Sequence, residues 1–238
     1  MKKSMLHVHH HLGLGDHIIC NGLVRSLVGE KADEVAVFVR DGNLPRVARM
    51  FDNESRIHLI PVPSDACVTD VSNLQFVNLY MQSRGGELLR LGFDQMNRAP
   101  QLNFDQVFYI FAGVPFSNRW DRFSVRRDLA EEQRVLSKLN PTGEPYIFVH
   151  DDPSRGFAFS PPNDRGLKVI RNDVSEDIFS MIGVLENATE IHCMESSFRC
   201  LIESIPSITC PLFLHKMVRF ANQPNPALSL GRKRWVEV

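Results

Sequence analysis

Short runs of apolar, mostly β-branched residues constrain the fold of this chain more than any other feature of its sequence. The clearest is EVAVFVR at Glu34–Arg40, and a second run, PYIFVH, lies at residues 145–150. Such runs are typical of strands that are buried on both faces of a parallel sheet. Apolar residues at helical spacing precede and follow the first run, so the sequence predicts an α/β fold with doubly wound parallel sheets.

The order of these patterns predicts two Rossmann-like halves that face a cleft, at residues 1–140 and 141–238, with a compact second half. An Asn-Pro-Thr-Gly cluster at residues 140–143 marks the boundary, because such residues favour turns and linkers. The strands expected in the first half span residues 6–8, 34–40, 56–62 and 106–114, and its helices span 18–27, 43–51, 73–82 and 126–139. The strands expected in the second half span residues 145–150, 167–171, 189–194 and 212–216, and its helices span 175–188 and 196–205.

The composition argues against several classes of function. The 238 residues are 43% hydrophobic and carry a net charge of −1, whereas a nucleic-acid binder is typically basic. No run approaches the ~18 apolar residues that span a bilayer, and no apolar signal sequence follows the basic N-terminus. Five widely spaced cysteines without a CxxC pair indicate free thiols and a cytoplasmic location. The basic run at residues 232–234 is expected to be a solvated tail.

The most informative turn is Gly13-Leu14-Gly15-Asp16, which follows the first expected strand. Its glycines allow a sharp turn that can approach a ligand closely, and the helix after it offers N–H groups that suit an anion. The turn is not GxGxxG, because Ile18 stands at the position of the third glycine, and it lacks the Gly-Lys-Ser/Thr of a P-loop. Asp16 would repel a phosphate, so it either caps the helix or accepts a proton as a base. Both interpretations stay open.

A second turn, Met194-Glu195-Ser196-Ser197-Phe198, joins a strand and a helix of the second half. The two serines can donate hydroxyl and backbone hydrogen bonds to a diphosphate, and Glu195 can accept hydrogen bonds from ribose hydroxyls. A plain serine N-cap explains the same residues equally well, so this turn is a nucleotide site or a structural cap.

These two turns, together with the order of the elements, resemble the heptosyltransferase-like glycosyltransferases of GT-B fold. The middle of the chain is not covered by the resemblance, and the chain is shorter than is usual for that family. The resemblance implies that residues 1–140 form an acceptor-side domain, in which Asp16 deprotonates the acceptor hydroxyl. It also implies that residues 141–238 form a nucleotide-sugar domain, in which Glu195, Ser196 and Ser197 bind the donor.

The function implied is transfer of a sugar from a nucleotide-sugar to a hydroxyl of a glycan or another acceptor, with inversion, in polysaccharide biosynthesis. Arg155 and Arg171 follow strand ends and suit contact with the donor's diphosphate. The residues expected to line the acceptor site or cleft are Gly13, Gly15, His10, His11, His17 and Arg119. A lipid-linked acceptor and peripheral contact with a membrane stay open. The alternatives are a nucleotide-sugar epimerase and a non-catalytic sugar- or nucleotide-binding module.

Two stretches that contain histidine suggest a metal site at first sight. His7, His9 and His11 share one face of a strand, but a spacing of about 7 Å along the strand is too wide for one ion. In HDDPSRGF, which begins at His150, adjacent strand residues point to opposite faces and do not converge. GT-B enzymes generally need no bound metal, so neither a metal nor any cofactor beyond the nucleotide-sugar substrate is expected.

Two segments of the middle of the chain have two interpretations each. The run PFSNRWDRF at residues 115–123 is either a sugar-stacking surface around Arg119 or a hydrophobic anchor. The run SRGGELL at residues 83–89 is either a lid over the acceptor or a surface turn.

Overall fold

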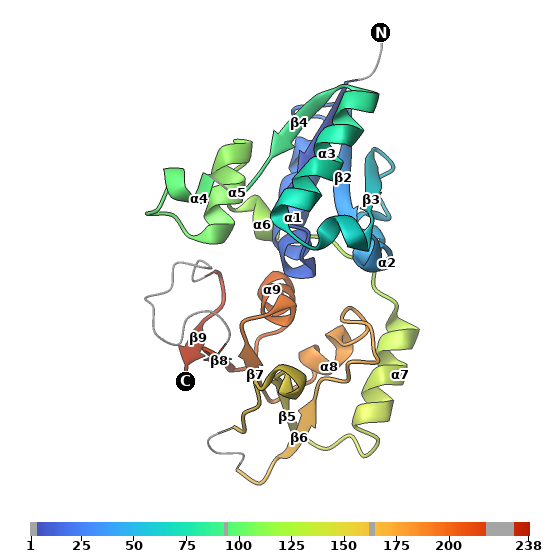
Figure 1. Cartoon of the computed structure of the whole chain (residues 1–238). Coiled ribbons are helices and arrows are strands. Elements are labelled where there is room, and N and C mark those ends of the chain that lie inside the picture. The colour runs from blue at the N-terminus through green and yellow to red at the C-terminus, as the bar shows by residue number, and fades with distance from the viewer. Residues whose placement is uncertain (1–3, 93–94, 162–164, 218–230) are drawn as a thin grey trace. The chain divides into compact units, whose positions relative to one another are not determined.

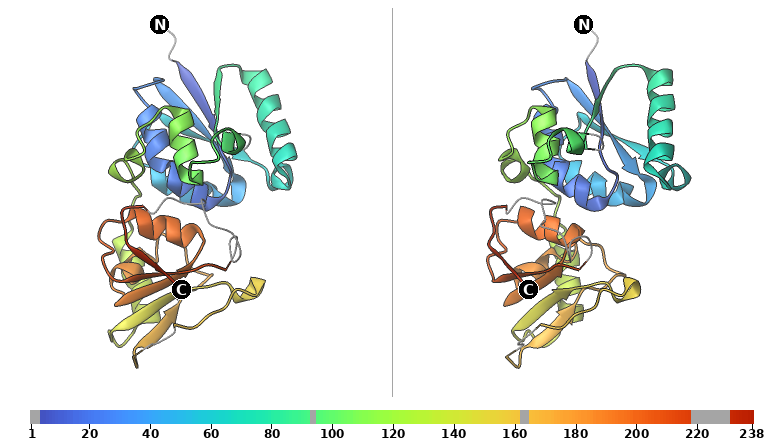
Figure 2. Two further views of the ribbon diagram at one scale, coloured as in Figure 1. Left: turned by 90° about the vertical axis from the view of Figure 1, so that its left-hand side faces the viewer. Right: turned by 60° about the vertical axis from the view of Figure 1, so that its left-hand side comes forward.

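A computed structural model describes residues 4–92, 95–161, 165–217 and 231–238 of the chain. The described residues form two compact units, one of residues 4–126 and one of residues 127–217 and 231–238. Each unit has one sheet whose strands pair in parallel, with helices packed on it (Figures 1 and 2). The predicted α/β architecture of two Rossmann-like units is confirmed.

The sheet of the first unit has the strand order β3-β2-β1-β4. Its strands are β1 (Met5–His9), β2 (Glu34–Arg40), β3 (Ile57–Val62) and β4 (Glu87–Arg90). Its helices are α1 (Leu14–Leu27), α2 (Leu44–Phe51), α3 (Asp70–Arg84), α4 (Gln95–Arg98), α5 (Phe104–Ala112) and α6 (Asn118–Asp121). Helix α3 covers one face of the sheet, and α1 and α5 lie on the other (Figure 2). The run EVAVFVR is strand β2, with its five middle residues buried, as its apolar composition predicts.

Two expectations for the middle of the chain are wrong. Residues 106–114, expected as a strand, lie mostly in helix α5. Asn103 and Gln106 form a capping box at its start, and Gly113 ends it in the left-handed region at φ 63°. These capping interactions outweigh the aromatic and β-branched composition that suggested a strand. The run at residues 83–89 is not a lid: it is an exposed turn only at Gly85 and Gly86, between α3 and β4, and its residues 87–89 lie in β4, which pairs with β1.

Helices α1, α5 and α6 pack closely in the first unit. A Cβ atom at Gly22 of α1 would lie 1.9 Å from the backbone oxygen of Asn118, so only glycine permits this approach of α1 to α6. The Asn118 amide donates to Ser26 Oγ over 2.8 Å, and the Tyr109 hydroxyl of α5 donates to the Ile19 carbonyl over 2.8 Å. Residues 115–123 thus serve as an anchor within the first unit, where Phe116 packs edge-on against Tyr109.

The sheet of the second unit has the order β6-β5-β7-β8-β9. Its strands are β5 (Tyr146–His150), β6 (Lys168–Arg171), β7 (Glu190–Met194), β8 (Leu212–His215) and β9 (Trp235–Glu237), and its helices are α7 (Leu129–Leu139), α8 (Ile182–Glu186) and α9 (Ser197–Ser204). The helix expected at residues 175–188 is only α8. Ser175 does not cap it, because its backbone N–H and hydroxyl both donate to Asp173 Oδ1 in a turn.

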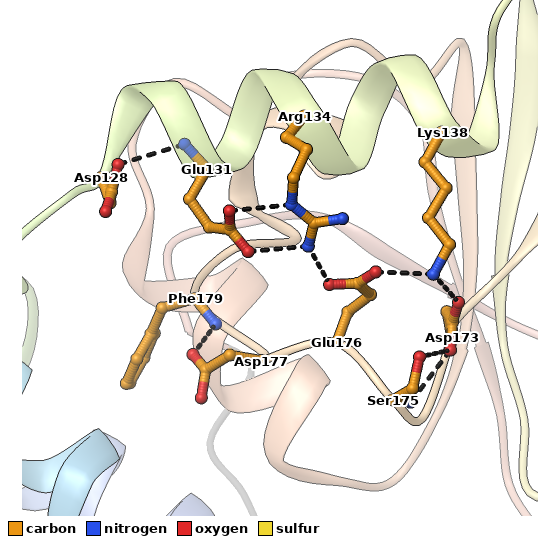
Figure 3. A network of polar contacts seen from close by, with 9 residues as sticks. All are labelled: Asp128, Glu131, Arg134, Lys138, Asp173, Ser175, Glu176, Asp177 and Phe179. Atoms are coloured by element: carbon orange, nitrogen blue, oxygen red, sulfur yellow. Dashed lines mark hydrogen bonds and ion pairs between the residues drawn. The ribbon is translucent and has the colours of Figure 1, made fainter.

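Helix α7 belongs to the second unit, which begins at Arg127 rather than at the expected residue 141. Lys138 of α7 contacts Asp173 at 2.8 Å and Glu176 at 2.6 Å, and Arg134 contacts Glu176 at 2.5 Å (Figure 3). Arg127 also pairs with Glu132 and with Glu186 of α8. The Asn-Pro-Thr-Gly cluster is therefore the turn from α7 into β5, not the boundary between the units.

The basic run at residues 232–234 leads into strand β9 and is not a free tail, although Arg232 and Arg234 are exposed as expected. Strand β9 pairs in parallel with β8. Glu203 of α9 accepts hydrogen bonds from the backbone N–H of Arg232 at 2.6 Å and of Lys233 at 3.2 Å, and from the Trp235 indole at 2.9 Å. The buried Glu203 carboxylate thus holds in place the residues that lead into β9.

Candidate functional site

The strand orders identify one edge of each sheet as the place where a ligand would bind. In the first sheet, β1 lies between β2 and β4, so the chain proceeds to one side of β1 and later returns to the other. In the second sheet, β5 has the same position between β6 and β7. Ligands of open parallel sheets bind beyond the carboxyl ends of the strands at such switch points. Residues 10–16 follow β1, residues 151–155 follow β5, and residues 195–197 follow β7, so each predicted turn lies at such an edge.

Asp16 is the third residue of α1, and Gly13 is the N-cap residue. Gly13 has φ −69° and ψ 148°, a backbone conformation open to every residue type, so the expected glycine-dependent turn is not its role. A Cβ atom at position 13 would instead lie 2.5 Å from Asp16 Oδ2. The glycine therefore leaves room for the Asp16 carboxylate, which folds back over the start of its own helix.

The histidines near Asp16 are more buried than residues that line an acceptor site would be. The rings of His10 and His17 meet edge to face, with 4.5 Å between their centroids, and they are 0% and 1% exposed. His10 Nδ1 bonds the His11 carbonyl at 2.6 Å, but His10 Nε2 and both ring nitrogens of His17 have no hydrogen-bond partner among the described residues. Burial lowers the pKa of His10 to about 4 and that of His17 well below its usual value. Both rings are therefore neutral at pH 7.

Two other residues expected on the acceptor side have neighbours within the first unit. Arg119 is 1% exposed and pairs with the fully buried Asp105, so this guanidinium has a structural role, contrary to the expected contact with an acceptor. His11 is partly buried beside Phe104, with ring centroids 5.6 Å apart. A Cβ at Gly92, which follows β4, would lie 2.8 Å from the His11 ring, so the two turns of this edge touch.

At the edge of the second sheet, Ser196 is the N-cap of α9. Its Oγ accepts a hydrogen bond from the Phe198 N–H at 3.2 Å, and Ser197 is the first residue of the helix. Glu195 Oε2 accepts from the Met217 N–H at 3.0 Å, so it ties the segment after β8 to this turn. The cap interpretation thus describes Ser196 in this structure, and the helix start carries the positive end of the dipole of α9.

The two predicted phosphate-binding arginines already have carboxylate partners. Arg155 contacts Asp152 at 2.5 Å and lies over the Phe157 ring. Arg171, at the end of β6, pairs with Asp151 and donates to the Phe159 carbonyl at 2.9 Å. Each cation is therefore held in place near the carboxyl edge of the sheet by a charge-assisted hydrogen bond.

Three histidines of the second unit were not predicted as ligand-binding residues, although His150 was considered as a metal ligand. His150, the last residue of β5, stacks on Phe198 with 4.2 Å between ring centroids, and its buried Nδ1 has no partner among the described residues. Burial lowers the pKa of His150 to about 4. His192 and His215 are hydrogen-bonded to each other on neighbouring strands. The alternation of Glu190 and His192 along β7 was the available signal, because two polar residues two positions apart share one face of a strand.

No three His, Cys, Asp or Glu side chains in the described part of the chain are grouped so that they could hold a metal ion. Across residues 4–92, 95–161, 165–217 and 231–238, no helix has the length and apolar character of a membrane span. The cysteines form no disulfide in the structure as described.

Comparison with known proteins gives no match by sequence: no family model and no curated protein matches the chain. By structure, the chain is similar to a glycosyl transferase family 9 protein from Veillonella parvula, with a TM-score of 0.58, 11% identity, and coverage of 100% of this chain and 88% of that one. It is also similar to TibC from enterotoxigenic E. coli, with a TM-score of 0.53 and 12% identity over 90% of this chain and 58% of that one. E. coli ADP-heptose LPS heptosyltransferase II matches with a TM-score of 0.49 at 9% identity, over 99% and 90% of the chains. The resemblance to GT-B glycosyltransferases is confirmed at the level of the fold.

One of these similarities corrects an expectation about cofactors. TibC is described as an iron-containing dodecameric glycosyltransferase. The inference that a chain of this fold needs no metal is therefore wrong, because a glycosyltransferase of similar fold contains iron.

Proposed function

We propose that this chain transfers a sugar from a nucleotide-sugar donor to a hydroxyl group of an acceptor, with inversion, and that Asp16 is the base. The fold similarity to glycosyltransferases supports the class of reaction. The observation that carries the proposal is the Asp16 carboxylate at the switch point of the first sheet, in space that Gly13 leaves open.

The chemistry needs a proton acceptor beside the acceptor hydroxyl and positive charge beside the leaving diphosphate. Asp16 is partly exposed at the start of α1, so its carboxylate can reach a hydroxyl. In the second unit, the start of α9 at Ser196 and Ser197 offers N–H groups and a positive dipole end for a diphosphate. Arg155 and Arg171 are proposed as supporting cations, and Glu195 as an acceptor for ribose hydroxyls.

The acceptor is proposed to be a glycan or a lipid-linked glycan, as in polysaccharide biosynthesis. Neutral His10 and His17 are buried, so they are proposed to support the turn that carries Asp16 rather than to contact the acceptor. Thiols that form no disulfide fit a reducing compartment, and we place the reaction in the cytoplasm.

The first test is thermal stabilisation by UDP, GDP, ADP and CMP, each at millimolar concentration. A ligand present at 100 times its Kd stabilises the folded state by about 2.7 kcal/mol, which is a shift of several degrees in Tm. Stabilisation by one nucleotide identifies the donor class. If none of the four shifts Tm, the proposed function is wrong.

The second test follows nucleoside diphosphate release from the matching nucleotide-sugar, with water as the acceptor. Asp16→Asn should slow release at least about 100-fold without changing nucleotide affinity, because only the proton acceptor is lost. Asp52→Asn, at an exposed carboxylate of the same unit, is the matched control and should release at the wild-type rate. Equal rates in Asp16→Asn and the control would remove the base assignment. An epimerase would convert the donor without releasing the nucleotide.

Gly13→Ala is a sharper variant of the same test. The new Cβ meets only the end of the Asp16 side chain, which can rotate away, so the fold should keep its stability while the carboxylate moves. We expect release to fall by about 10-fold or more with Tm unchanged. A fully active Gly13→Ala protein would mean that the position of the Asp16 carboxylate is unimportant.

A further inference from the structure

The second unit contains a chain of three hydrogen-bonded side chains, Glu190, His192 and His215, which the proposed reaction does not use. Glu190 Oε1 lies 3.0 Å from His192 Nε2, and His192 Nδ1 lies 2.9 Å from His215 Nε2. Glu190 and His192 are two residues apart on β7, and His215 ends the neighbouring strand β8. All three side chains are at most 9% exposed.

The order of donors and acceptors among Glu190, His192 and His215 follows from the carboxylate of Glu190. Arg165 contacts the other oxygen of Glu190 at 2.5 Å, and a carboxylate paired with a guanidinium acts only as a hydrogen-bond acceptor. His192 Nε2 therefore carries the hydrogen. In a neutral imidazole the second nitrogen is then an acceptor, so His192 Nδ1 accepts from His215 Nε2–H. The remaining nitrogen, His215 Nδ1, carries a lone pair.

The residues around His192 and His215 hold the two rings in place and keep them neutral. Phe213 stacks on His192 with 4.5 Å between ring centroids, and Phe159 stacks on His215 at 3.6 Å. Arg171 in turn donates to the Phe159 carbonyl. Burial lowers the pKa of His192, and it lowers the pKa of His215 to about 4, so neither ring is an imidazolium at pH 7.

In the hydrogen-bonded series Glu190–His192–His215, the last nitrogen, His215 Nδ1, is the atom that can recognise a ligand. In the described part of the protein, no side chain or backbone group hydrogen-bonds to it. His215 is the last residue of β8, on the carboxyl edge where parallel sheets bind ligands, and β8 adjoins β7 and its Glu195–Ser196 turn. A fixed lone pair at this edge suits a hydroxyl donor and repels the oxygens of a phosphate.

We propose that His215 Nδ1 accepts a hydrogen bond from a hydroxyl group of the donor substrate, and that Glu190 and His192 are positioning residues that hold His215 in its Nε2–H tautomer. The proposal rests on the proposed function, because the ligand is taken to be a nucleotide-sugar. It assigns donor recognition to a side chain outside the turns found in the sequence. The hydroxyl belongs either to the ribose or to the transferred sugar.

The first experiment measures the tautomers without any ligand, by ¹⁵N NMR of the histidine rings at pH 7. We expect His192 and His215 both as Nε2–H tautomers. Glu190→Gln, which can donate as well as accept, should release this preference and give a mixed population at His215. A His215 ring in the Nδ1–H form in the wild-type protein would overturn the proposal.

The second experiment compares two isosteres at position 215 by calorimetric titration. The Gln amide reaches the place of Nε2 and can still donate to His192, whereas the Asn amide reaches the place of Nδ1 and can accept from the ligand. His215→Gln should therefore weaken binding of the nucleotide-sugar about 3- to 10-fold, as expected for one hydrogen bond, and His215→Asn should weaken it less.

The ligands of this titration identify the hydroxyl. If the ribose supplies it, the same loss appears with the nucleoside diphosphate alone and vanishes with its 2′,3′-dideoxy analogue. If the sugar supplies it, the loss appears only with the nucleotide-sugar. Unchanged affinity of His215→Gln for every ligand that the wild type binds overturns the inference and leaves the proposed function intact. Absence of any nucleotide binding by the wild-type protein overturns both.

Discussion

Two pairs of neighbouring histidines, His10 with His17 in the first unit and His192 with His215 in the second, differ in their hydrogen bonding. In the first unit, His10 and His17 touch each other, and three of their four ring nitrogens lack partners among the described residues. In the second unit, His192 and His215 are bonded to each other and to Glu190. A buried polar atom without a partner costs about 1–3 kcal/mol, so the His10–His17 pair is expected to lower the stability of the first unit. The His192–His215 pair of the second unit is already hydrogen-bonded before any ligand binds.

The largest expected effect breaks the buried ion pair of the first unit. Asp105→Asn leaves the Arg119 guanidinium buried beside a neutral group and should destabilise that unit by about 3–5 kcal/mol. The matched change in the second unit is Arg165→Met, which should cost about 1 kcal/mol, because the side chain of Arg165 is 63% exposed and water can replace it. Urea unfolding measures both. The two tryptophans, Trp120 and Trp235, report on one unit each in single-tryptophan variants. Equal losses would contradict the difference in burial.

Acid should destabilise both units through their neutral histidines. A histidine with a pKa of about 4 in the folded protein and about 6.5 in the unfolded chain binds its proton mainly after unfolding between these pH values. Stability is therefore full above about pH 6.5 and falls with pH, by about 2 kcal/mol per such histidine at pH 5. Urea midpoints at pH 7 and pH 5 test this, and His10→Phe should reduce the loss in the first unit. A midpoint independent of pH would show that the rings are not held neutral.

Removing one imidazole from each unit should have effects of opposite sign. His17→Leu replaces a ring without hydrogen bonds and should stabilise the first unit by about 1 kcal/mol. His192→Leu leaves both Glu190 and His215 without their shared partner and should destabilise the second unit by about 1–2 kcal/mol. Thermal unfolding of the two variants checks the signs. Destabilisation by His17→Leu would mean that its ring nitrogens are bonded in solution.

The smallest effect concerns the two helix starts. Ser196→Ala removes the cap of α9 and should cost about 1 kcal/mol, with Ser197→Ala as the neighbouring control of smaller effect. Helix α1 has no side-chain cap at Gly13, so its stability rests on packing instead. Hydrogen exchange in the first turn of each helix measures the difference. Faster exchange after Ser197→Ala than after Ser196→Ala would contradict the assignment of the cap.

The sequence predicted the elements whose burial is uniform. Strand β2 was predicted at its observed bounds, because a run of apolar residues buried on both faces leaves no other arrangement. Helix α5 was missed, because its capping box and Gly113 decide its conformation and a run of aromatic residues is compatible with a strand. The hydrogen-bonded series Glu190–His192–His215 was not predicted, because His192 and His215 are distant in sequence and only the register of β7 and β8 brings them together. The extent of the second unit could not be predicted either, since it depends on ion pairs between α7 and residues 173–176.

The space that Gly13 leaves for Asp16 has a consequence for how mutations at this position should be interpreted. A selection that scores only folded protein should accept alanine at position 13, because the backbone there is ordinary and the displaced carboxylate can rotate. A selection that scores turnover should reject it. A residue that is dispensable to the fold and required by the chemistry marks an active site without any ligand, and the contrast between the two selections would locate this one.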